Sequence, residues 1–345
     1  MIELIKKLSN SHGVSGFEGE VRELIKAELE DFADEIKVDK LGNLIATRNG
    51  DELDLMLSAH MDEIGFVVKK IDEKGFIRIA PIGGWFSQIL VAQRVVLYGK
   101  KKFYGVIGCK PPHVMKDEER KKAIEIGDMF VDVGARSKEE VLKLGIDVGT
   151  PVAIDREVEL LVNNRITGKA FDNRVGVAVA IESFRKCNNS ATIHFVATIQ
   201  EEVGLKGAKT SAFLLEPDIA IAVDSCVSTD FPGNESVHMD IALGKGPVIT
   251  IVDASGRGLI VSQKVLEWIK KTAERNGIPY QLEVAEGGTT DATAINLTKE
   301  GIPAGVVSIP ARYIHSPVEV VDLKDVEWAV ELVKKSIENV RDYFR

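Results

Sequence analysis

A short apolar run rich in β-branched residues, at positions 193–199, is followed at once by Gln200, Glu201 and Glu202. Its length and composition are typical of a buried strand. Successive side chains of a strand point to opposite faces, so the two carboxylates cannot serve one purpose if the strand continues through them. One would then bind a cation while the other faces a neighbouring water. The alternative is a solvated pair that opens the next helix, where carboxylates suit the helix dipole.

Strand-like and helix-like segments alternate on both sides of this run. Near the N-terminus we expect a helix at 18–34 and strands at 36–38, 44–47 and 53–59. After residue 163 we expect helices at 173–186, 205–215, 261–276, 290–300 and 322–342, and strands at 192–199, 218–224, 247–253, 280–285 and 302–309. This alternation predicts a three-layer α/β domain, with helices on both faces of one sheet.

The middle of the chain has a different pattern. Short alternating segments, separated by Gly, Pro and charge clusters, recur at 66–71, 76–80, 91–98, 103–107, 129–133 and 152–154. They indicate a small, mostly β domain with one short helix at 137–144. The sequence therefore predicts one α/β domain, formed by residues 1–64 and 163–345, that is interrupted by a β insert at 65–162.

Composition excludes several classes of protein. The net charge of −9 argues against sequence-independent binding to nucleic acid or to an anionic membrane. No apolar stretch approaches the roughly 18 residues that span a bilayer, and the first residues read as an amphipathic helix rather than a signal peptide. The three cysteines are scattered, which favours neither a disulfide framework nor a thiolate metal site. We expect a reducing cytoplasm as the compartment.

Histidines and carboxylates follow several of the predicted strands. In α/β sheets, functional sites collect at the carboxyl ends of strands, so these side chains are expected to converge on one edge. The positions are His60 and Asp62 after the strand 53–59, Glu201 and Glu202 after 192–199, Asp224 at the end of 218–224, His315 beyond 302–309, and Asp172 just before the helix 173–186.

Two imidazoles and several carboxylates, without cysteine, suit one or two divalent ions such as zinc, cobalt or manganese. Strand geometry points His60 and Asp62 to the same side, where an aspartate commonly fixes the tautomer of a neighbouring histidine. Taken singly, each residue has a structural alternative, such as a helix cap for Asp172 or a turn for Asp224. The whole set favours a metal site.

This ordered set resembles that of the two-metal exopeptidases, and within them the chain resembles the tetrahedral (TET) aminopeptidase family, also called deblocking or glutamyl aminopeptidases. The resemblance runs essentially end to end and rests on the segments 58–65, 168–174, 198–204, 287–292 and 310–316. Related carboxypeptidases and deacylases carry their insert after the third carboxylate ligand. Here the insert falls between His60 and Asp172, which favours the aminopeptidases.

The resemblance implies a catalytic domain of the zinc-exopeptidase type and a β-barrel-like insert that forms dimers, which associate into a tetrahedral dodecamer. It implies two ions, zinc or cobalt, in each subunit. It also implies roles for seven residues: Asp172 as the bridge between the ions, His60 and Asp224 on one ion, Glu202 and His315 on the other, Glu201 as the general base, and Asp62 as the residue that orients His60.

Further candidates for substrate binding lie near these motifs. Backbone N–H groups at Gly288 and Thr289 could hold the substrate backbone or a carboxylate, although a capped helix start explains them equally well. Arg312 and Tyr313 lie beside His315 in sequence and could line the substrate cleft. A structural ion pair is the alternative for Arg312.

The sequence therefore predicts a metal-dependent aminopeptidase that removes the N-terminal residue of short peptides. The enzymatic alternative is a two-metal carboxypeptidase or acyl-amino-acid deacylase. A non-enzymatic binding or scaffold protein is the remaining alternative, and Glu201 argues against it because metal retention alone requires no second carboxylate there. Neutral aliphatic and acidic N-terminal residues are both admissible, although the net negative charge disfavours acidic substrates at long range.

Overall fold

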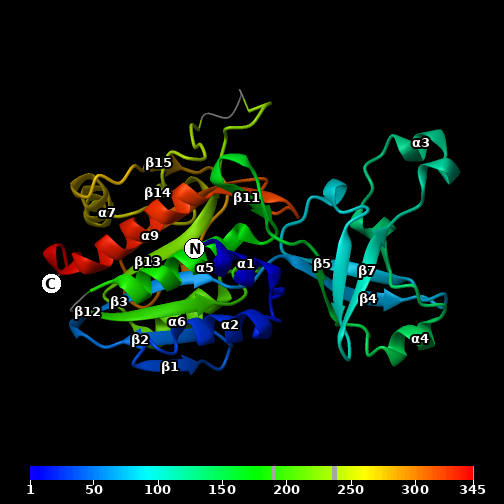
Figure 1. Ribbon diagram of the computed structural model, residues 1–345, viewed down its shortest axis with the longest axis horizontal. Coiled ribbons are helices and arrows are strands. Elements are labelled where there is room, and N and C mark those ends of the chain that lie inside the picture. The colour runs from blue at the N-terminus through cyan, green and yellow to red at the C-terminus, as the bar shows by residue number, and fades with distance from the viewer. Residues whose placement is uncertain (189–190, 235–238, 345) are drawn as a thin grey trace.

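A large mixed sheet and a separate β-barrel lie side by side in the computed structural model, which describes residues 1–188, 191–234 and 239–344 (Figure 1). The chain enters the barrel directly after the sheet strand β3 (Asp51–His60) and returns to the sheet at β10 (Glu159–Leu160). Both termini belong to the body that contains the sheet (Figure 1). In the described part of the chain, no helix has the length and apolarity that crossing a membrane requires.

Within the described residues, the large sheet has eleven strands. Its main path runs in the order β1 (Glu35–Val38), β2 (Leu44–Arg48), β12 (Ala191–Thr198), β3, β13 (Ile219–Val227), β16 (Ala304–Arg312), β17 (Glu319–Asp322), β11 (Arg165–Gly168) and β10, with β14 (Val248–Val252) and β15 (Gln281–Val284) branching from β16. The neighbours β12, β3, β13 and β16 are mutually parallel, so their carboxyl ends meet at one edge.

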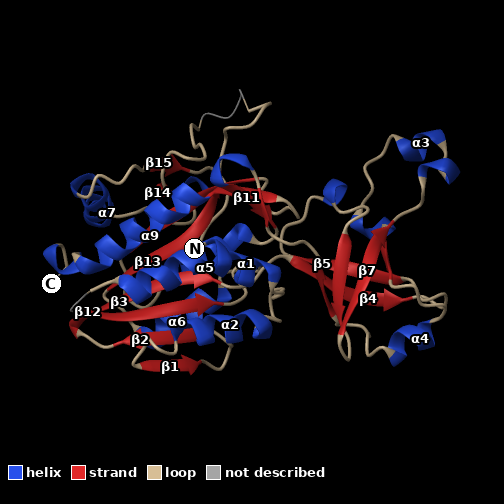
Figure 2. Cartoon of the chain, viewed as in Figure 1, coloured by secondary structure: helices blue, strands red, loops and turns tan. Residues whose placement is uncertain are grey.

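Helices cover the sheet on both faces (Figure 2). One layer contains α1 (Ile2–Asn10), α2 (Gly19–Leu29), α5 (Phe171–Lys186), α7 (Gln263–Arg275) and α9 (Leu323–Glu338), and the other contains α6 (Lys206–Leu215) and α8 (Asp291–Asn296). The central helix α5 is apolar almost all round, because it packs between α9 and strands β3 and β13. The prediction of a three-layer α/β fold is confirmed.

The barrel has a hydrophobic core of its own, built around Phe66, Leu97, Ile107 and Val152. Its strands close in the order β4 (Gly65–Ile71), β5 (Ile77–Ile82), β8 (Phe130–Asp132), β7 (Lys102–Gly108), β6 (Arg94–Tyr98) and β9 (Pro151–Ile154). The helices α3 (Asp117–Arg120) and α4 (Lys138–Lys143) lie outside it (Figure 1). Each barrel strand corresponds to a segment that the alternating pattern predicts.

A buried ion network fastens the start of the barrel to the α/β body. Glu63 follows β3 and accepts hydrogen bonds from Lys169 Nζ at 2.7 Å and from Arg174 Nη2 at 3.3 Å. The backbone N–H of Gly13 donates to the same carboxylate at 2.8 Å. All three charged side chains are buried. The network thus joins the α1–α2 connection, the exit of β3 and the beginning of α5.

The structure differs from the sequence-based expectations in a few elements. β10, β11 and β17 extend the sheet and were not predicted, because each is at most four residues long. β10 pairs with β11 in the large sheet, although it lies inside the range 65–162 that was assigned to the insert. β12 ends at Thr198, so the condition of the alternation argument, a strand that continues through Glu201 and Glu202, is not met.

The substitution Glu63→Gln is expected to lower the free energy of unfolding by about 3 kcal/mol, because it leaves two buried cations without their counter-charge. The midpoint of thermal unfolding at fixed protein concentration measures the effect. Glu119→Gln breaks the exposed ion pair with Lys110 and is the matched control, for which the midpoint should hardly move. Equal midpoints for the two variants would show that the buried network does not hold the junction.

Candidate metal centre and substrate cavity

Turns with left-handed backbone place the candidate side chains at the carboxyl edge of the sheet. His60 is the last residue of β3. Beyond the end of β12, Gln200 takes φ = +52°, and this turn brings Glu201 and Glu202 back over the edge. His315 itself has φ = +60° in the turn after β16. Non-glycine residues at positive φ are uncommon and cluster at functional sites.

Asp172 and Asp224 reach the same edge in different ways. Asp172 lies in the first turn of α5, after Ala170 in the left-handed region, with its own φ and ψ outside the helical range. Asp224 lies within β13 rather than at its end, because this strand continues to Val227. β3 and β13 are adjacent and parallel, which sets His60 beside Asp224.

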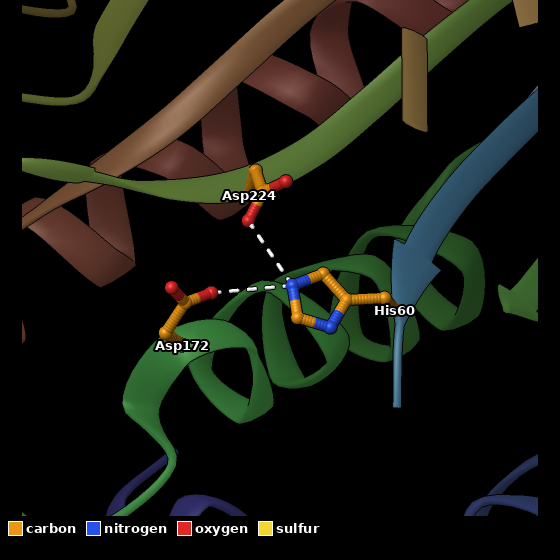
Figure 3. A group of neighbouring side chains, drawn as sticks. All are labelled: His60, Asp172 and Asp224. Atoms are coloured by element: carbon orange, nitrogen blue, oxygen red, sulfur yellow. Dashed lines mark hydrogen bonds and ion pairs between the residues drawn. The ribbon is translucent and has the colours of Figure 1, made fainter. Parts of the chain in front are cut away.

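His60, Asp172 and Asp224 form one compact group, shown in Figure 3. His60 Nε2 lies 3.2 Å from Asp172 Oδ1 and 3.6 Å from Asp224 Oδ1. Both carboxylates thus approach the same ring nitrogen (Figure 3). One imidazole and two carboxylates, from β3, α5 and β13, are a suitable donor set for a divalent cation.

A second group shares Asp172 and adds Glu202 and His315. His315 Nε2 lies 3.4 Å from Asp172 Oδ2 and 3.2 Å from Glu202 Oε2. The two groups therefore use different oxygens of Asp172. In each group the donor atoms lie within 4.8 Å of one another.

Negative charge is in excess at this edge. Burial raises the pKa of Glu201 well above its usual range, and burial also raises the pKa of Glu202 and of Asp224. Burial alone would lower the pKa of His315, but the adjoining Asp172 and Glu202 outweigh it and raise that pKa to about 11. The crowded carboxylates must therefore be neutralised by protons or by cations.

An unpaired carboxylate oxygen also indicates that the donor set fits divalent cations. Glu202 Oε1 is buried and has no hydrogen-bond partner among the described residues. A buried carboxylate oxygen without a donor is costly, and a coordinated cation removes that cost. The structure thus brings the five predicted ligands into two groups that share one carboxylate.

Asp62 supports both the ligands and Glu201. Its oxygens accept hydrogen bonds from the backbone N–H groups of Glu201 at 3.0 Å and Glu202 at 3.3 Å, and from Ser15 Oγ at 2.7 Å. Its Oδ1 lies 3.5 Å from His60 Nδ1. A proton on Nδ1, facing Asp62, leaves the Nε2 lone pair directed at Asp172 and Asp224.

Glu319 on β17 has a similar supporting position that the sequence analysis missed. Its two oxygens accept the backbone N–H of Asp172 at 3.0 Å and the backbone N–H of His315 at 2.9 Å. The side chain is buried. The available signal was a single carboxylate inside the apolar run 318–321. Glu319 therefore fixes the backbone of two candidate ligands in the second group.

The barrel also borders this centre. Between β5 and β6, Gly84 lies so close to His315 that an added Cβ would be 3.2 Å from His315 Nδ1. The next residue, Trp85, stacks on Phe66 and donates from Nε1 to the carbonyl of Gly65 at 2.9 Å. This loop is thereby held to the first barrel strand.

A cavity of about 740 Å³ opens from the metal-ligand groups towards β14 and β15. Gly288 and Thr289 line it, as their predicted contact with substrate requires. Arg312 and Tyr313 were also predicted to line the substrate cleft, but they are not among the residues that line this cavity. Arg312 forms a two-point ion pair with Asp230, at 2.9 and 2.6 Å, which is the structural alternative. Tyr313 is half-exposed beside Phe231.

Comparison with known proteins gives the class and the family. The fold and these comparisons define a metal-dependent aminopeptidase, a hydrolase that acts on peptide bonds. The chain belongs to the M42 glutamyl aminopeptidase family, whose model matches residues 42–332. It therefore uses a divalent metal.

Curated relatives differ in the substrate that their names give. A lysyl aminopeptidase of Pyrococcus furiosus is 36% identical over 98% of this chain and 97% of its own length. A glutamyl aminopeptidase of Lactococcus lactis is 31% identical over 94% of this chain and 92% of its own length. The names favour an aminopeptidase over the carboxypeptidase or deacylase alternative.

Solved structures agree with the fold. An aminopeptidase from the archaeon Desulfurococcus kamchatkensis superposes with a TM-score of 0.93, at 48% identity, over 98% of this chain and 94% of that one. A TET1 peptidase from Pyrococcus horikoshii, described as assembling into a tetrahedron or a large octahedral shell, superposes with a TM-score of 0.89, at 35% identity, over 98% of this chain and 99% of that one.

Gly207→Ala should lower kcat/KM for peptide substrates by about a hundredfold, because small displacements of catalytic groups cost rates of that order. A Cβ at Gly207 in α6 would lie 2.5 Å from the backbone nitrogen and 2.6 Å from the oxygen of Ile199, so the turn that carries Glu201 must shift. Kinetics and bound-metal content measure the effect. Gly127→Ala, which meets nothing within 4 Å, is the control, and equal activity of both variants would contradict the argument.

Proposed function

We propose that the chain is a two-metal aminopeptidase that removes the N-terminal residue of short peptides. The observation that carries the proposal is the sharing of Asp172 between two donor groups, one through each oxygen. A carboxylate in this position suits a bridge between two cations. Two ions, zinc or cobalt, are the proposed cofactors, and imidazole with carboxylate donors suits both metals.

The proposed ligands are His60, Asp172 and Asp224 for one ion, and Asp172, Glu202 and His315 for the other. When bound, such ions supply Lewis acidity, which makes a water nucleophilic near neutral pH and stabilises negative charge that develops on the scissile carbonyl oxygen. Asp62 keeps the Nε2 atom of His60 available to the cation, and Glu319 holds the backbone of Asp172 and His315 in place.

Glu201 is the proposed general base. Its Oε2 lies 3.9 Å from His60 Nε2, and Glu201 lines the cavity but belongs to neither donor group. Burial raises the pKa of its carboxyl group well above the usual range, which makes Glu201 a stronger base than an exposed glutamate. It would take a proton from the attacking water and then deliver it to the nitrogen of the leaving amine.

A free amino terminus complements the site better than a blocked one. The carboxylates at this edge favour a basic nitrogen, whereas an N-acetyl group removes that basicity and adds bulk. Free and N-acetylated forms of the same peptide test the exopeptidase preference. Release of amino acids only from the C-terminal end would instead select the carboxypeptidase alternative.

Glu201→Gln should lower kcat by about 10²- to 10⁴-fold, because the amide cannot accept the proton. The enzyme is stripped of metal, reloaded with zinc or cobalt, and assayed on aminoacyl amides, and its bound metal is counted. Two ions in both proteins, with loss of turnover only in the variant, are the expected result. Full activity of Glu201→Gln with two ions bound would show that Glu201 is not the general base. A wild-type chain that binds no metal would contradict the whole proposal.

Self-association is part of the proposal. Residues 1–64 and 163–345 would form the catalytic domain, and residues 65–162 would form a dimerisation domain whose dimers build a tetrahedral dodecamer. The outward face of β7 supports this, because Tyr104 and Val106 are 68% and 48% exposed on the same side of the strand. We also propose a cytoplasmic location, which the small number of scattered cysteines supports.

Tyr104→Asp is expected to reduce the mass of the assembly, since a charge on the apolar face of β7 opposes its burial between subunits. Sedimentation velocity measures the mass. Tyr104→Phe keeps the apolar contact and should leave the assembly unchanged. A wild-type protein that sediments as a stable monomer at working concentration would contradict self-association.

A further inference from the structure

Beyond the proposed metal ligands, the wall of the cavity carries one buried carboxylate that has spare bonding capacity. Glu283 lies on β15, whose buried and exposed positions place it on the inner side of the strand. It is only 7% exposed. Its register partner on β14 is Thr250, whose Oγ1 donates to Glu283 Oε2 at 2.8 Å. Among the described residues, no donor reaches Glu283 Oε1.

The other carboxylates of this wall are in different situations. Asp253 accepts the backbone N–H of Leu259 on one oxygen, and its other oxygen is approached by the hydroxyls of Thr289 at 3.4 Å and Thr293 at 3.5 Å. Both of its oxygens are therefore occupied within the protein. Glu286 is exposed to solvent at the rim. Glu283 is thus the buried carboxylate of this wall that has an oxygen free to bind a substrate.

Lysine and arginine side chains do not neutralise this wall. Lysine and arginine are absent from the described residues that line the cavity. The arginine nearest in sequence to the ligand His315, Arg312, is already paired with Asp230. Metal ions would offset the carboxylates at the catalytic end, but Glu283 belongs to neither donor group. A buried carboxylate without a cation is unfavourable, and a cation on the substrate would relieve it.

We propose that Glu283 makes the enzyme selective for peptides whose N-terminal residue is lysine or arginine. This inference rests on the proposed aminopeptidase function, because it takes the N-terminal side chain to extend from the catalytic end into the cavity. The ammonium or guanidinium group donates to Glu283 Oε1, and the apolar stem of the side chain meets the apolar lining that includes Ala285 and Ile314. A glutamate side chain would meet Glu283 with like charge and is excluded.

The experiment compares substrates that differ in this one charge. Wild-type enzyme and Glu283→Gln, both loaded with metal, are assayed on the 4-nitroanilides of lysine, norleucine and glutamate. Norleucine has a similar apolar stem without the ammonium group. We expect wild type to favour lysine over norleucine by about tenfold to a hundredfold in kcat/KM, as charged hydrogen bonds do. In Glu283→Gln this preference should largely vanish, because kcat/KM for the lysine substrate falls while kcat/KM for the norleucine substrate stays the same.

Binding provides a second measurement that does not depend on turnover. Calorimetric titration of metal-loaded wild type with free L-lysine and L-norleucine should show tighter binding of lysine, and Glu283→Gln should bind the two alike. Glu286→Gln removes a carboxylate from the exposed rim of the same cavity. It should change the preference by less than about threefold, because the charge it removes is screened by solvent.

These measurements distinguish failure of the Glu283 contact from failure of the aminopeptidase function. Equal effects of Glu283→Gln and Glu286→Gln would show a diffuse field instead of a specific contact and would overturn the assignment of Glu283. Good turnover of norleucine or glutamate substrates without a lysine preference would overturn the inference and leave the aminopeptidase function standing. No turnover of any aminoacyl substrate by the metal-loaded wild type would reject the aminopeptidase function itself.

Discussion

The contact of Asp172 with two histidines governs the layout of the carboxyl edge of the sheet. His60 ends a central strand, His315 follows another strand two places along the sheet, and Asp172 comes from the helix that packs across them. One carboxylate can touch both imidazoles only if α5 begins at the carboxyl edge. The left-handed residue at Ala170 and the carboxylate of Glu319 hold that helix start where the contact requires it.

Such a concentration of carboxylates is unstable without a compensating framework. Asp62 and Glu319 supply it by accepting backbone N–H groups of the very residues whose side chains crowd together. Glu63, beside Asp62 in the chain, is neutralised by Lys169 and Arg174. The protein therefore separates two tasks. Some buried carboxylates are satisfied within the fold, whereas Glu202 and Glu283 each keep one oxygen that no donor among the described residues reaches.

Much of this arrangement could be predicted from sequence because it follows from strand ends. His60, Glu202 and His315 each lie just beyond an apolar run, and the parallel order of the strands brings them to one edge. Other contacts of the site region have no such signal in the sequence. The pairing of Arg312 with Asp230, the backbone contacts of Glu319 and the inward side of Glu283 depend on turn geometry and on short strands, which residue periodicity does not encode.

The closeness of Gly84 to His315 has a consequence for the architecture as a whole. The β5–β6 loop belongs to the barrel, yet it forms part of the immediate surroundings of an imidazole in the α/β body. The barrel is thus no detachable accessory. An engineered version trimmed to the α/β body alone would lose the loop that lies against His315. A displacement of the barrel would in turn be transmitted to that imidazole through Gly84.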